Sequence, residues 1–568
     1  MLFIDGIIVI TYFVAITAIG LYMGRREESL HEFALGGRRM PWWAVMASII
    51  AAEVSAATFL GTPGEGYDKR SLAYVQLVWG LILGRVLVGY VFLKPYFTYR
   101  VYTVYDYLGI RFGPMTKAYV SALFLIMRTL ASGTRLFVPA LVMVLAWRMF
   151  TQGQMPRFDQ QAVSTVWPYF AAIVTLTILT CIYTTFGGIK AVIWTDLVQA
   201  CVMFASAIIA IVTLLYHIGG DTWNLGSGLG ALANAVPAMT RVDGYFLTGF
   251  EGHSFAELGV WGSIKLVLAS DYTLFSALIA STLTNMAYFG TDQDLVQRML
   301  SAQTYQKSRR SLITAAIVDV PIASAFTFIG ILLFVYFHQN PTYKPESNAD
   351  LFGSYILNVM PPIVRGIVLA GVFATAMGSL SAALNALATS ATNDWYIRLV
   401  RGRRDNSHYL SAARFFTALF AILMILIATV FAYVKVKDPS VRIIPVVLGI
   451  GSFIVGPMLG VFLIGMFTRR RGSDLGNILA ITAGLITTAY LGGLHVMLFG
   501  LMDITFPQPP IKVSFTWFAF IGAMVVFIVG LFFSTPKEVL EQVDRQAARA
   551  DDRPMDMRRE GFEISDLV

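Results

Sequence analysis

The sequence has little charge and almost no cysteine. Only 13% of its 568 residues are Asp, Glu, Lys or Arg, whereas 57% are hydrophobic. A single soluble core cannot hide that much apolar surface, so the composition excludes an ordinary soluble globular protein. The two cysteines, Cys181 and Cys201, both fall inside apolar runs, where a disulfide role is not expected. The composition indicates an integral membrane protein.

Little of the chain is left over for a soluble domain. Apolar runs of about 20 residues, the length that crosses a bilayer, recur from end to end. We predict about thirteen of them, near residues 3–22, 43–62, 72–97, 119–147, 166–186, 192–216, 268–290, 312–337, 364–391, 409–434, 443–467, 475–499 and 514–534. We therefore expect one polytopic all-α domain over residues 1–534, followed by a charged cytoplasmic tail over 535–568. The segment 217–267 shows no pattern of an independent fold.

Motifs of membrane enzymes and of nucleotide-binding proteins are also missing. There is no His-Glu-x-x-His zinc motif, and the glycine-rich stretch GTPGEGYDK, residues 61–69, does not match a Walker loop. The net charge of +8 is explained by basic cytoplasmic loops that face anionic lipid, which disfavours nucleic-acid binding. We expect no enzymatic activity and no obligate protein partner. A polytopic membrane enzyme is the alternative from a different functional class.

Basic residues predict the orientation of the chain in the cell membrane. They occupy every second connection between the apolar runs, from Arg25 after the first run to Arg469, Arg470 and Arg471 after the eleventh. Short loops rich in Lys and Arg stay in the cytoplasm. The pattern predicts an N-terminus outside and a C-terminus inside. No basic residue precedes the first run, so we expect it to remain as a span and not to be cleaved as a signal peptide.

A carboxylate and helix-breaking residues interrupt the second run. The stretch AAEVSAATFLGTPGEGY, residues 51–67, contains Glu53 and, further on, Gly-Thr-Pro-Gly. A charge near the bilayer centre costs about 2.5 to 3.5 kcal/mol on insertion scales, so it must face protein, water or an opposite charge. Broken backbone at membrane depth is tolerated where it lines a cavity or is buried in protein. The plain alternative is that Gly61, Pro63 and Gly64 only mark the end of the span.

Three further apolar runs also carry polar groups. TLTNMAYFGTDQDLVQR, residues 282–298, repeats the interrupted design, and such segments in both halves of a chain point to a secondary transporter with inverted repeats. In the run 372–396, Thr375 and Ser379 share one helical face, and hydroxyls there suit either a hard cation or helix packing. Asp196, near the start of the sixth run, is either an anchor at the cytoplasmic end or an ion ligand.

Five stretches together resemble the sodium:solute symporter family. They are EFALGGRRMPWW (32–43), SAATFLGTPGEGY (55–67), GGIKAVIWTDLVQ (187–199), GTDQDLVQRMLSA (290–302) and the run around 375–394. The resemblance covers about residues 4–471. It implies a LeuT-type core of two inverted five-helix repeats, about 41–216 and 268–471, with one extra helix before the core and two after it. It also implies Na⁺ as the coupling ion.

The resemblance also implies residues for the coupling ion. A first sodium site would use the backbone carbonyls of Ala51 and Val54 together with Thr375, Gly378 and Ser379. Relatives carry two hydroxyls where this chain has Gly378-Ser379, and Thr375 is a candidate to compensate. A second sodium site, seen in part of the family, would pair Asp196 with Ser381.

The resemblance places the substrate beside these ions. Six residues at the two interruptions resemble positions that contact or cover substrate in the family: Ser55, Ala56, Thr58, Asn285, Tyr288 and Phe289. The sodium/galactose transporters have long polar side chains near Thr58 and Gly449, and a lysine where this chain has Asp319. Those differences argue against a hexose, and a sodium/sugar symporter is the alternative.

Two arginines inside an apolar run suggest an acidic substrate. Arg128 and Arg135 are seven residues apart in LIMRTLASGTRLFVPALV and so share a helical face. Arginine is the natural bidentate partner of a carboxylate. An equally good interpretation is that one arginine pairs with Glu53 or Asp319 inside the bundle. We expect symport of a small organic acid or amino acid into the cytoplasm, by alternating access.

Overall fold

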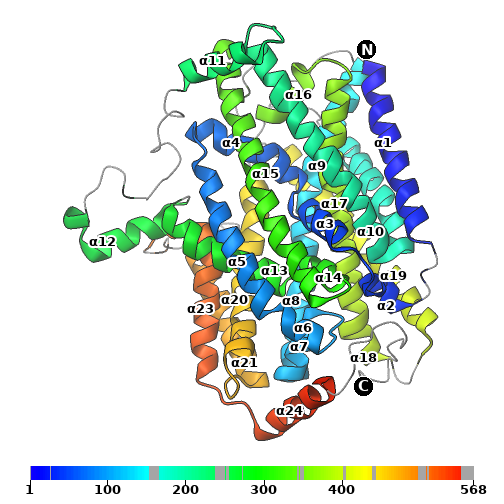
Figure 1. Ribbon diagram of the computed structural model, residues 1–568, viewed down its shortest axis with the longest axis vertical. Helices are drawn as coiled ribbons and strands as arrows, with labels where there is room; N and C mark the ends of the chain where they lie inside the picture. Colours follow the sequence, from blue (N-terminus) through cyan, green and yellow to red (C-terminus); the bar gives the residue numbers. More distant parts are fainter. Residues whose placement is uncertain are drawn as a thin grey trace.

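The computed structural model describes residues 2–25, 27, 29–152, 165–236, 250, 255–271, 273–341, 345, 351–400, 404–437, 443–496, 507, 509 and 511–551. These residues form helices joined by turns, with two isolated bridges and no strand among them (Figure 1). Eight of the described helices are long and apolar enough to cross a membrane, or up to nine if a bent pair counts as one span. The all-α expectation is confirmed.

The longer helices follow the predicted apolar runs. In chain order they are α1 (Leu2–Met23), α3 (Trp42–Glu53), α4 (Ala56–Lys69), α5 (Leu77–Val91), α8 (Pro114–Arg135), α9 (Phe137–Gln152), α10 (Trp167–Ile218), α13 (Thr282–Thr291), α15 (Tyr305–Gln339), α17 (Val364–Ser390), α19 (Asn406–Lys437), α20 (Ile443–Phe467), α21 (Asp474–Leu491) and α23 (Phe518–Leu531). Other elements lie between these helices or after them: α2 (Leu30–Leu35), α6 (Leu93–Thr98), α7 (Val104–Arg111), α11 (Leu225–Ala235), α12 (Phe255–Ala269), the π-helices η5 (Ser276–Ser281) and η8 (Ala391–Tyr396), α14 (Gln293–Leu300), α16 (Leu351–Asn358), α18 (Ile397–Leu399) and α24 (Lys537–Asp551).

The second run is broken earlier than its Gly-Thr-Pro-Gly sequence suggests. α3 ends at Glu53 and α4 starts at Ala56, and the two helices meet at an angle of 68°. Val54 and Ser55 adopt extended backbone between them, and the Ser55 hydroxyl accepts a hydrogen bond from the Thr58 N–H, 3.4 Å away. A serine that caps the second helix fixes the break here. Pro63 and its flanking glycines lie inside α4, which continues to Lys69.

A second break lies in the stretch 282–298. α13 ends at Thr291 and α14 begins at Gln293, with Asp292 in extended backbone between them. The Asp292 carboxylate accepts a hydrogen bond from the Asp294 N–H at 3.0 Å and so caps α14. The break comes two residues after the glycine of this stretch. In both polar stretches, therefore, one helix ends and a second helix begins within three residues.

The 52 residues of α10 contain two of the predicted runs. A straight helix of that length would reach about 78 Å at 1.5 Å per residue, far beyond the roughly 30 Å of a bilayer core. Gly188, with φ 47° and ψ −153°, interrupts it. A side chain is strained in that conformation, and glycine adopts it freely. α10 therefore consists of two helical segments, and the chain changes direction between them at Gly188.

Several of the short helices lie at the two ends of the bundle. α2, α6, α7, α18 and α24 lie at the end opposite to the start of α1, and α11 and α16 lie at the end where α1 starts (Figure 1). α6, α7 and α18 carry basic residues, whereas α11 and α16 carry no charge. Three short helices at one end thus carry basic residues, and the orientation of the chain in the membrane stays a prediction. The last part of the predicted tail, residues 552–568, lies outside the described residues.

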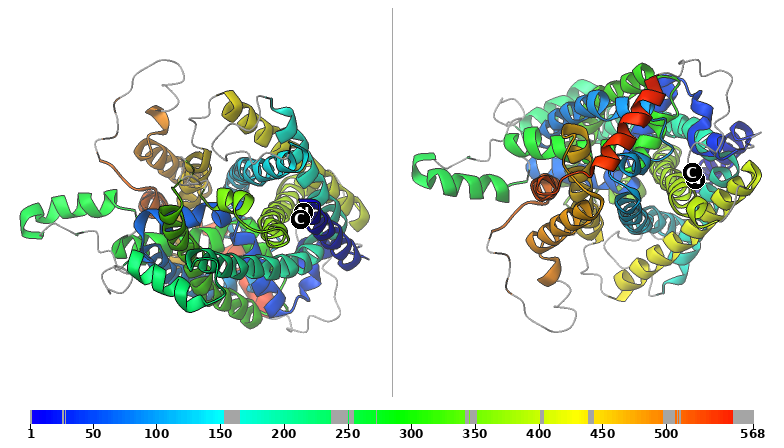
Figure 2. Two further views of the ribbon diagram at one scale, coloured as in Figure 1. Left: turned by 90° about the horizontal axis from the view of Figure 1, so that it is seen from above. Right: turned by 90° about the horizontal axis from the view of Figure 1, so that it is seen from below.

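α17 forms the centre of the bundle. Of its 27 residues, 24 are buried, and it packs against α1, α3, α8, α10 and α19. Seen along the long axis, the helices surround one another and form no separate layers (Figure 2). The polar residues of α17 therefore face other helices.

α4 and α15 approach each other closely through two glycines. A Cβ atom on Gly66 would lie 2.0 Å from the Thr327 carbonyl oxygen, and one on Gly330 would lie 1.8 Å from the Pro63 carbonyl oxygen. Neither backbone can yield without moving its helix. The contact holds the second half of the broken span against α15.

We predict that Gly66→Ala destabilises the protein by about 1 to 3 kcal/mol, because the added methyl overpacks this contact. Gly61→Ala is the matched control, since a Cβ at Gly61 of the same helix meets nothing within 4 Å. Thermal unfolding in detergent measures both variants. An unchanged midpoint for Gly66→Ala would show that the two helices do not pack in this way.

Glu27, in the connection between α1 and α2, is buried without a hydrogen bond to its carboxylate from any residue that the structure describes. It lies against Gly188, whose Cβ would come within 2.6 Å of a Glu27 oxygen. Burial raises the pKa of Glu27 to about 9; Glu32 adds to the rise, and Lys190 and Arg414 oppose it.

Glu27 should make the protein less stable as the pH rises. Its pKa in the folded chain exceeds the ordinary value of 4.5, so between these two values the folded state binds more protons than the unfolded state. The free energy of unfolding therefore falls from about pH 4.5 to about pH 9. We expect Glu27→Gln to melt increasingly above wild type across this range. Parallel pH profiles of the two midpoints would contradict the assignment.

Candidate functional site

A pocket lies where the broken second span meets α8, α9 and α17. The space in it that a water-sized molecule can occupy measures about 20 Å³. Three groups of residues line it: Ser55 and Ala56 from the break; Ser132, Arg135, Leu136 and Pro139 from the α8–α9 region; and Ala376, Ser379 and Leu380 from α17. The break, an arginine and the hydroxyl-bearing helix are thus brought to one cavity.

Three oxygens converge on Gly378 of α17. A Cβ at Gly378 would lie 2.8 Å from Gln199 Oε1, 3.3 Å from the Ala51 carbonyl oxygen and 3.6 Å from Asp196 Oδ1. Ala51 is in the last turn of α3, whose carbonyl groups lose partners because the helix ends at Glu53. The missing side chain of Gly378 leaves room between α3, α10 and α17.

Buried side-chain oxygens meet at this point. Within the described ranges, Asp196 Oδ1 has no hydrogen-bond partner, and the Gln199 amide lies beside the Tyr12 and Tyr183 hydroxyls. Asp196 is 0% and Gln199 1% exposed. Buried acceptors without donors are costly, and oxygen ligands are what a hard cation takes. The arrangement suits Na⁺. Gln199 was missed from the sequence, although its i, i+3 spacing from Asp196 places both on one face of α10.

The two hydroxyls predicted for the first sodium site are close to this point. Thr375 Oγ1 donates to the Val372 carbonyl at 2.8 Å, and Ser379 Oγ donates to the Ala376 carbonyl at 3.1 Å. A hydroxyl that donates its proton to its own helix keeps its lone pairs for another partner. Val54 caps α3 beside them.

Asp196 and Ser381 make different contacts from the predicted pair. Asp196 Oδ2 accepts a hydrogen bond from Ser48 at 2.5 Å and pairs with Arg298 at 3.3 Å. Ser381 donates to the Gly378 carbonyl at 3.0 Å. Asp196 thus has one oxygen held by protein groups, and only Oδ1 is left for a ligand.

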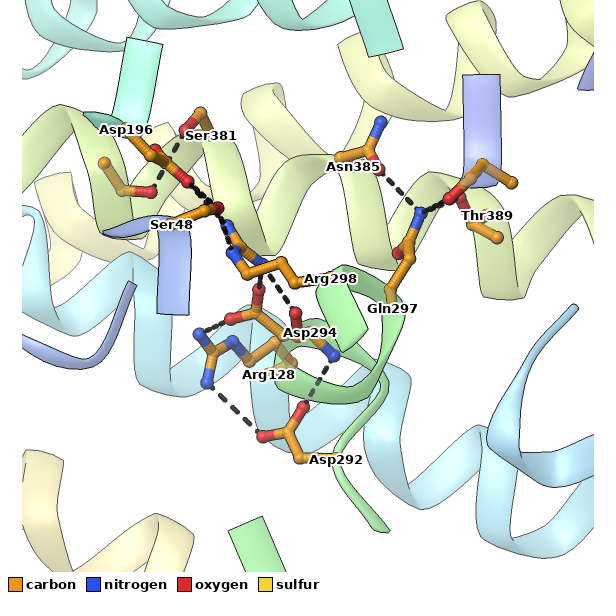
Figure 3. A network of polar contacts seen from close by, with 12 residues as sticks. Ser48, Arg128, Asp196, Asp292, Asp294, Gln297, Arg298, Ser381, Asn385 and Thr389 are labelled. Carbon is orange, nitrogen blue, oxygen red and sulfur yellow. Dashed lines mark hydrogen bonds and ion pairs between the residues drawn. The ribbon is translucent and has the colours of Figure 1, made fainter. Parts of the chain in front are cut away.

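Arg298 joins this aspartate to a larger ion-pair network (Figure 3). It contacts Asp294 Oδ1 at 2.8 Å, and Asp294 also pairs with Arg128, which lies 3.4 Å from Asp292. Arg128 is thus occupied by two carboxylates of the second break. It is not among the residues that line the pocket.

Arg135 differs from Arg128 in the groups that surround its guanidinium. It lines the pocket, and within the described part of the chain it has neither an ion pair nor a hydrogen bond. The pocket therefore offers a guanidinium group to a ligand.

The three predicted residues of α13 do not line the pocket. Asn285 donates to the Ser281 carbonyl at 2.8 Å. The Tyr288 hydroxyl lies 2.7 Å from the position that a Cβ atom on Gly451 would occupy. Tyr288 is also within electrostatic reach of Arg135. Phe289 is buried, and the Arg85 guanidinium lies 3.9 Å from its ring centroid.

Glu53 and Asp319 share Arg85 as their partner. Arg85 Nη1 lies 2.7 Å from Asp319 Oδ2, and Nη2 pairs with Glu53. The alternative that Arg128 or Arg135 would pair with these acids is wrong. Arg85 was overlooked in the sequence, although a lone arginine in the apolar stretch WGLILGRVLVGY was a signal for a buried ion pair.

Comparisons with known proteins find a family model and several sodium symporters that are similar to this chain. A model of the sodium:solute symporter family matches residues 33–484. The sodium/sialic acid symporter SiaT of Proteus mirabilis (strain HI4320) is 24% identical over 515 residues, which cover 88% of this chain and 92% of the relative. The sodium/glucose cotransporter of Vibrio parahaemolyticus is 25% identical over 517 residues, or 86% and 85%. A solved structure of a Na⁺-coupled sialic acid symporter in a substrate-bound outward-open state has the same fold, with a TM-score of 0.73, 23% identity and coverage of 93% and 97%.

We predict that Gly378→Ala abolishes stabilisation by sodium, because its methyl would fill the space between the three oxygens. The measurement is the thermal midpoint in NaCl against KCl. Gly371→Ala is the control on the same helix: its Cβ would meet Ser206 Oγ at 2.2 Å, so it should lower both midpoints and keep their difference. A full sodium effect in Gly378→Ala would rule out a cation at this point.

Proposed function

The chain belongs to the sodium:solute symporter family, and we propose that it carries a small organic acid or amino acid into the cytoplasm together with sodium. It is a multi-pass protein of the cell membrane, and Na⁺ is its coupling ion. The observation that supports a carboxylate-bearing solute is Arg135, which lines the pocket at the helix break without an ion-pair partner among the described residues. Its planar guanidinium can bind a carboxylate through two parallel hydrogen bonds.

We infer thirteen membrane crossings, with the N-terminus outside and the C-terminus inside. α10 would supply two of them, and α3 with α4 would supply one. The first inverted repeat would run from α3 to the end of α10, about 41–216, and the second from α13 to α20, about 268–471. The positions of the two breaks, at Val54–Ser55 and at Asp292, support this division, since each lies in the first span of its repeat.

Sodium would bind in two places along α17. The first site comprises the carbonyls of Ala51 and Val54 with Thr375, Gly378 and Ser379, and we add Gln199 because its amide oxygen points at Gly378. The second would use Asp196 and Ser381, with Oδ1 of Asp196, the oxygen that also faces Gly378, as its ligand.

The proposed sodium site and the pocket both adjoin the break after α3 and helix α17, which explains how binding of the ion and of the solute would be coupled. Ser55 and Ser379 line the pocket, and both are within a turn of the oxygens at Gly378. A cation there draws the end of α3 towards α17 and so orders the pocket wall. Such a coupling must be reciprocal, so bound solute strengthens sodium binding. Rocking of one repeat against the other then exposes both ligands to the cytoplasm.

A sugar is the alternative substrate, because a sodium/glucose cotransporter is among the similar proteins. A neutral hexose offers no charge to Arg135. The side chains that bind hexoses in the family are also absent here, with Thr58 and Asp319 in their places.

The test measures thermal stability of the purified protein in NaCl or KCl with organic acids, amino acids and sugars. Sodium should raise the midpoint, and one acid or amino acid should raise it further only in sodium. We expect Arg135→Gln to weaken binding of that solute at least tenfold, since a charged hydrogen bond contributes roughly 1.5 to 3 kcal/mol. Arg135→Lys should bind better than Arg135→Gln, and both should keep the sodium effect. A sugar that stabilises wild type and Arg135→Gln equally would overturn the carboxylate assignment.

A further inference from the structure

Two acids and one arginine meet beside the break in the second span. Glu53 is the last residue of α3, Arg85 comes from α5 and Asp319 from α15. Their side chains are 27%, 0% and 6% exposed, respectively. With both acids ionised the cluster carries one net negative charge inside an apolar bundle. A buried charge of this kind requires a partner.

The single positive charge of Arg85 does not neutralise both acids of the cluster. Its guanidinium pairs with both acids, and the ring of Phe289 covers one of its faces at 3.9 Å. One positive charge is thus shared between two carboxylates. Two other buried arginines, Arg128 and Arg298, pair with Asp292, Asp294 and Asp196, so they are not available either.

The acidic pair has capacity for another donor. Asp319 is 5% exposed, and its Oδ1 receives no hydrogen bond from any residue that the structure describes. The Glu53 and Asp319 carboxyl groups are held close together because both pair with the Arg85 guanidinium. Two neighbouring carboxyl groups repel each other unless a donor lies between or beside them, and that donor is either a proton or a positively charged group. Glu53, as the more exposed of the two acids, is the one that a mobile ligand can reach.

The acidic pair is close to the pocket wall. Consecutive Cα atoms are 3.8 Å apart, so Glu53 is at most about 7.6 Å along the chain from Ser55, which lines the pocket. Tyr288, within electrostatic reach of Arg135, is next in sequence to Phe289, which contacts Arg85. α13 therefore lies between Arg135, which has no ion pair among the described residues, and the cluster of Glu53, Asp319 and Arg85, in which acids outnumber the arginine. This arrangement complements a small molecule that carries both charges.

We propose that Glu53 and Asp319 bind the ammonium group of the transported solute while Arg135 binds its carboxylate. The inference rests on the proposed function and narrows it: the solute is a zwitterion of the amino-acid type. An ammonium group has three N–H donors and can bond to both carboxylates at once. Arg85 then orders the two acids and limits their repulsion. A zwitterion adds no net charge, so the positive charge of each sodium ion is transported uncompensated by the solute.

Neutralising either acid leaves no net charge in the cluster, so the variants test binding without adding a buried charge. Glu53→Gln and Asp319→Asn each leave one carboxylate with one arginine, so neither variant creates an unpaired buried charge, and both should fold. We expect their midpoints without solute to be at least as high as that of wild type. Glu65→Gln, in α4 of the same broken span, is the matched control that neutralises an acid away from the cluster.

The experiment uses the full chain in detergent and NaCl. The probes are the twenty common L-amino acids, each paired with its N-acetyl derivative, which keeps the carboxylate and removes the ammonium charge. The shift of the thermal midpoint with probe concentration gives an apparent Kd. We expect at least one amino acid to stabilise the protein, and its N-acetyl derivative to need at least 100-fold more. Glu53→Gln and Asp319→Asn should weaken the amino acid at least tenfold, keep the sodium effect and leave the N-acetyl derivative unchanged. Glu65→Gln should behave as wild type.

Four results would overturn the inference. The first is an N-acetyl derivative that binds as well as its amino acid. The second is unchanged amino-acid affinity in both Glu53→Gln and Asp319→Asn, in which case any loss of pH dependence in these variants would assign the pair to a proton. The third is sodium stabilisation without any amino acid that adds to it, which would leave the proposed symport intact. The fourth is the absence of a sodium effect in wild type, which would remove the proposed function as well.

Discussion

The site depends on the cost of leaving backbone polar groups without partners in an apolar environment. Helix α3 ends at Glu53, so the carbonyls of its last turn must be satisfied by something other than the helix. The break is kept because Ser55 caps α4 and because α4 is held against α15 through Gly66 and Gly330. The pocket wall, the oxygens at Gly378 and the acidic pair all adjoin this one interruption.

Buried charge separates structural groups from groups that can bind a ligand. Arg85, Arg128 and Arg298 lie inside the bundle and are each held by two carboxylates. These pairs join helices that are distant in the sequence and fix the geometry around the site. Arg135 has no such partner in the described chain, and Asp196 keeps one oxygen free. In a low-dielectric interior these exceptions mark where a ligand contributes the missing charge.

Much of the architecture could be predicted from hydropathy, because a chain that spans a bilayer must satisfy its backbone within helices. The two polar stretches, Asp196 and Arg135 were also found that way, since polar groups are conspicuous in apolar runs. The exact break was not: Gly-Thr-Pro-Gly is the stronger local signal, yet α4 contains it. Gln199 and Arg85 were missed because their roles depend on Gly378 and Asp319, which are 179 and 234 positions away.

The sequence by itself determined that this is an all-α membrane protein of the sodium:solute symporter family, with polar interruptions in its second and seventh apolar runs. Composition and motif order are properties of the chain alone. Only the tertiary structure decided which arginine is paired and which is free, because that depends on which carboxylates are brought within about 4 Å. Arg128 and Arg135 are equivalent by type and spacing. Packing of α8 against the second break occupies one of them and leaves the other to the pocket.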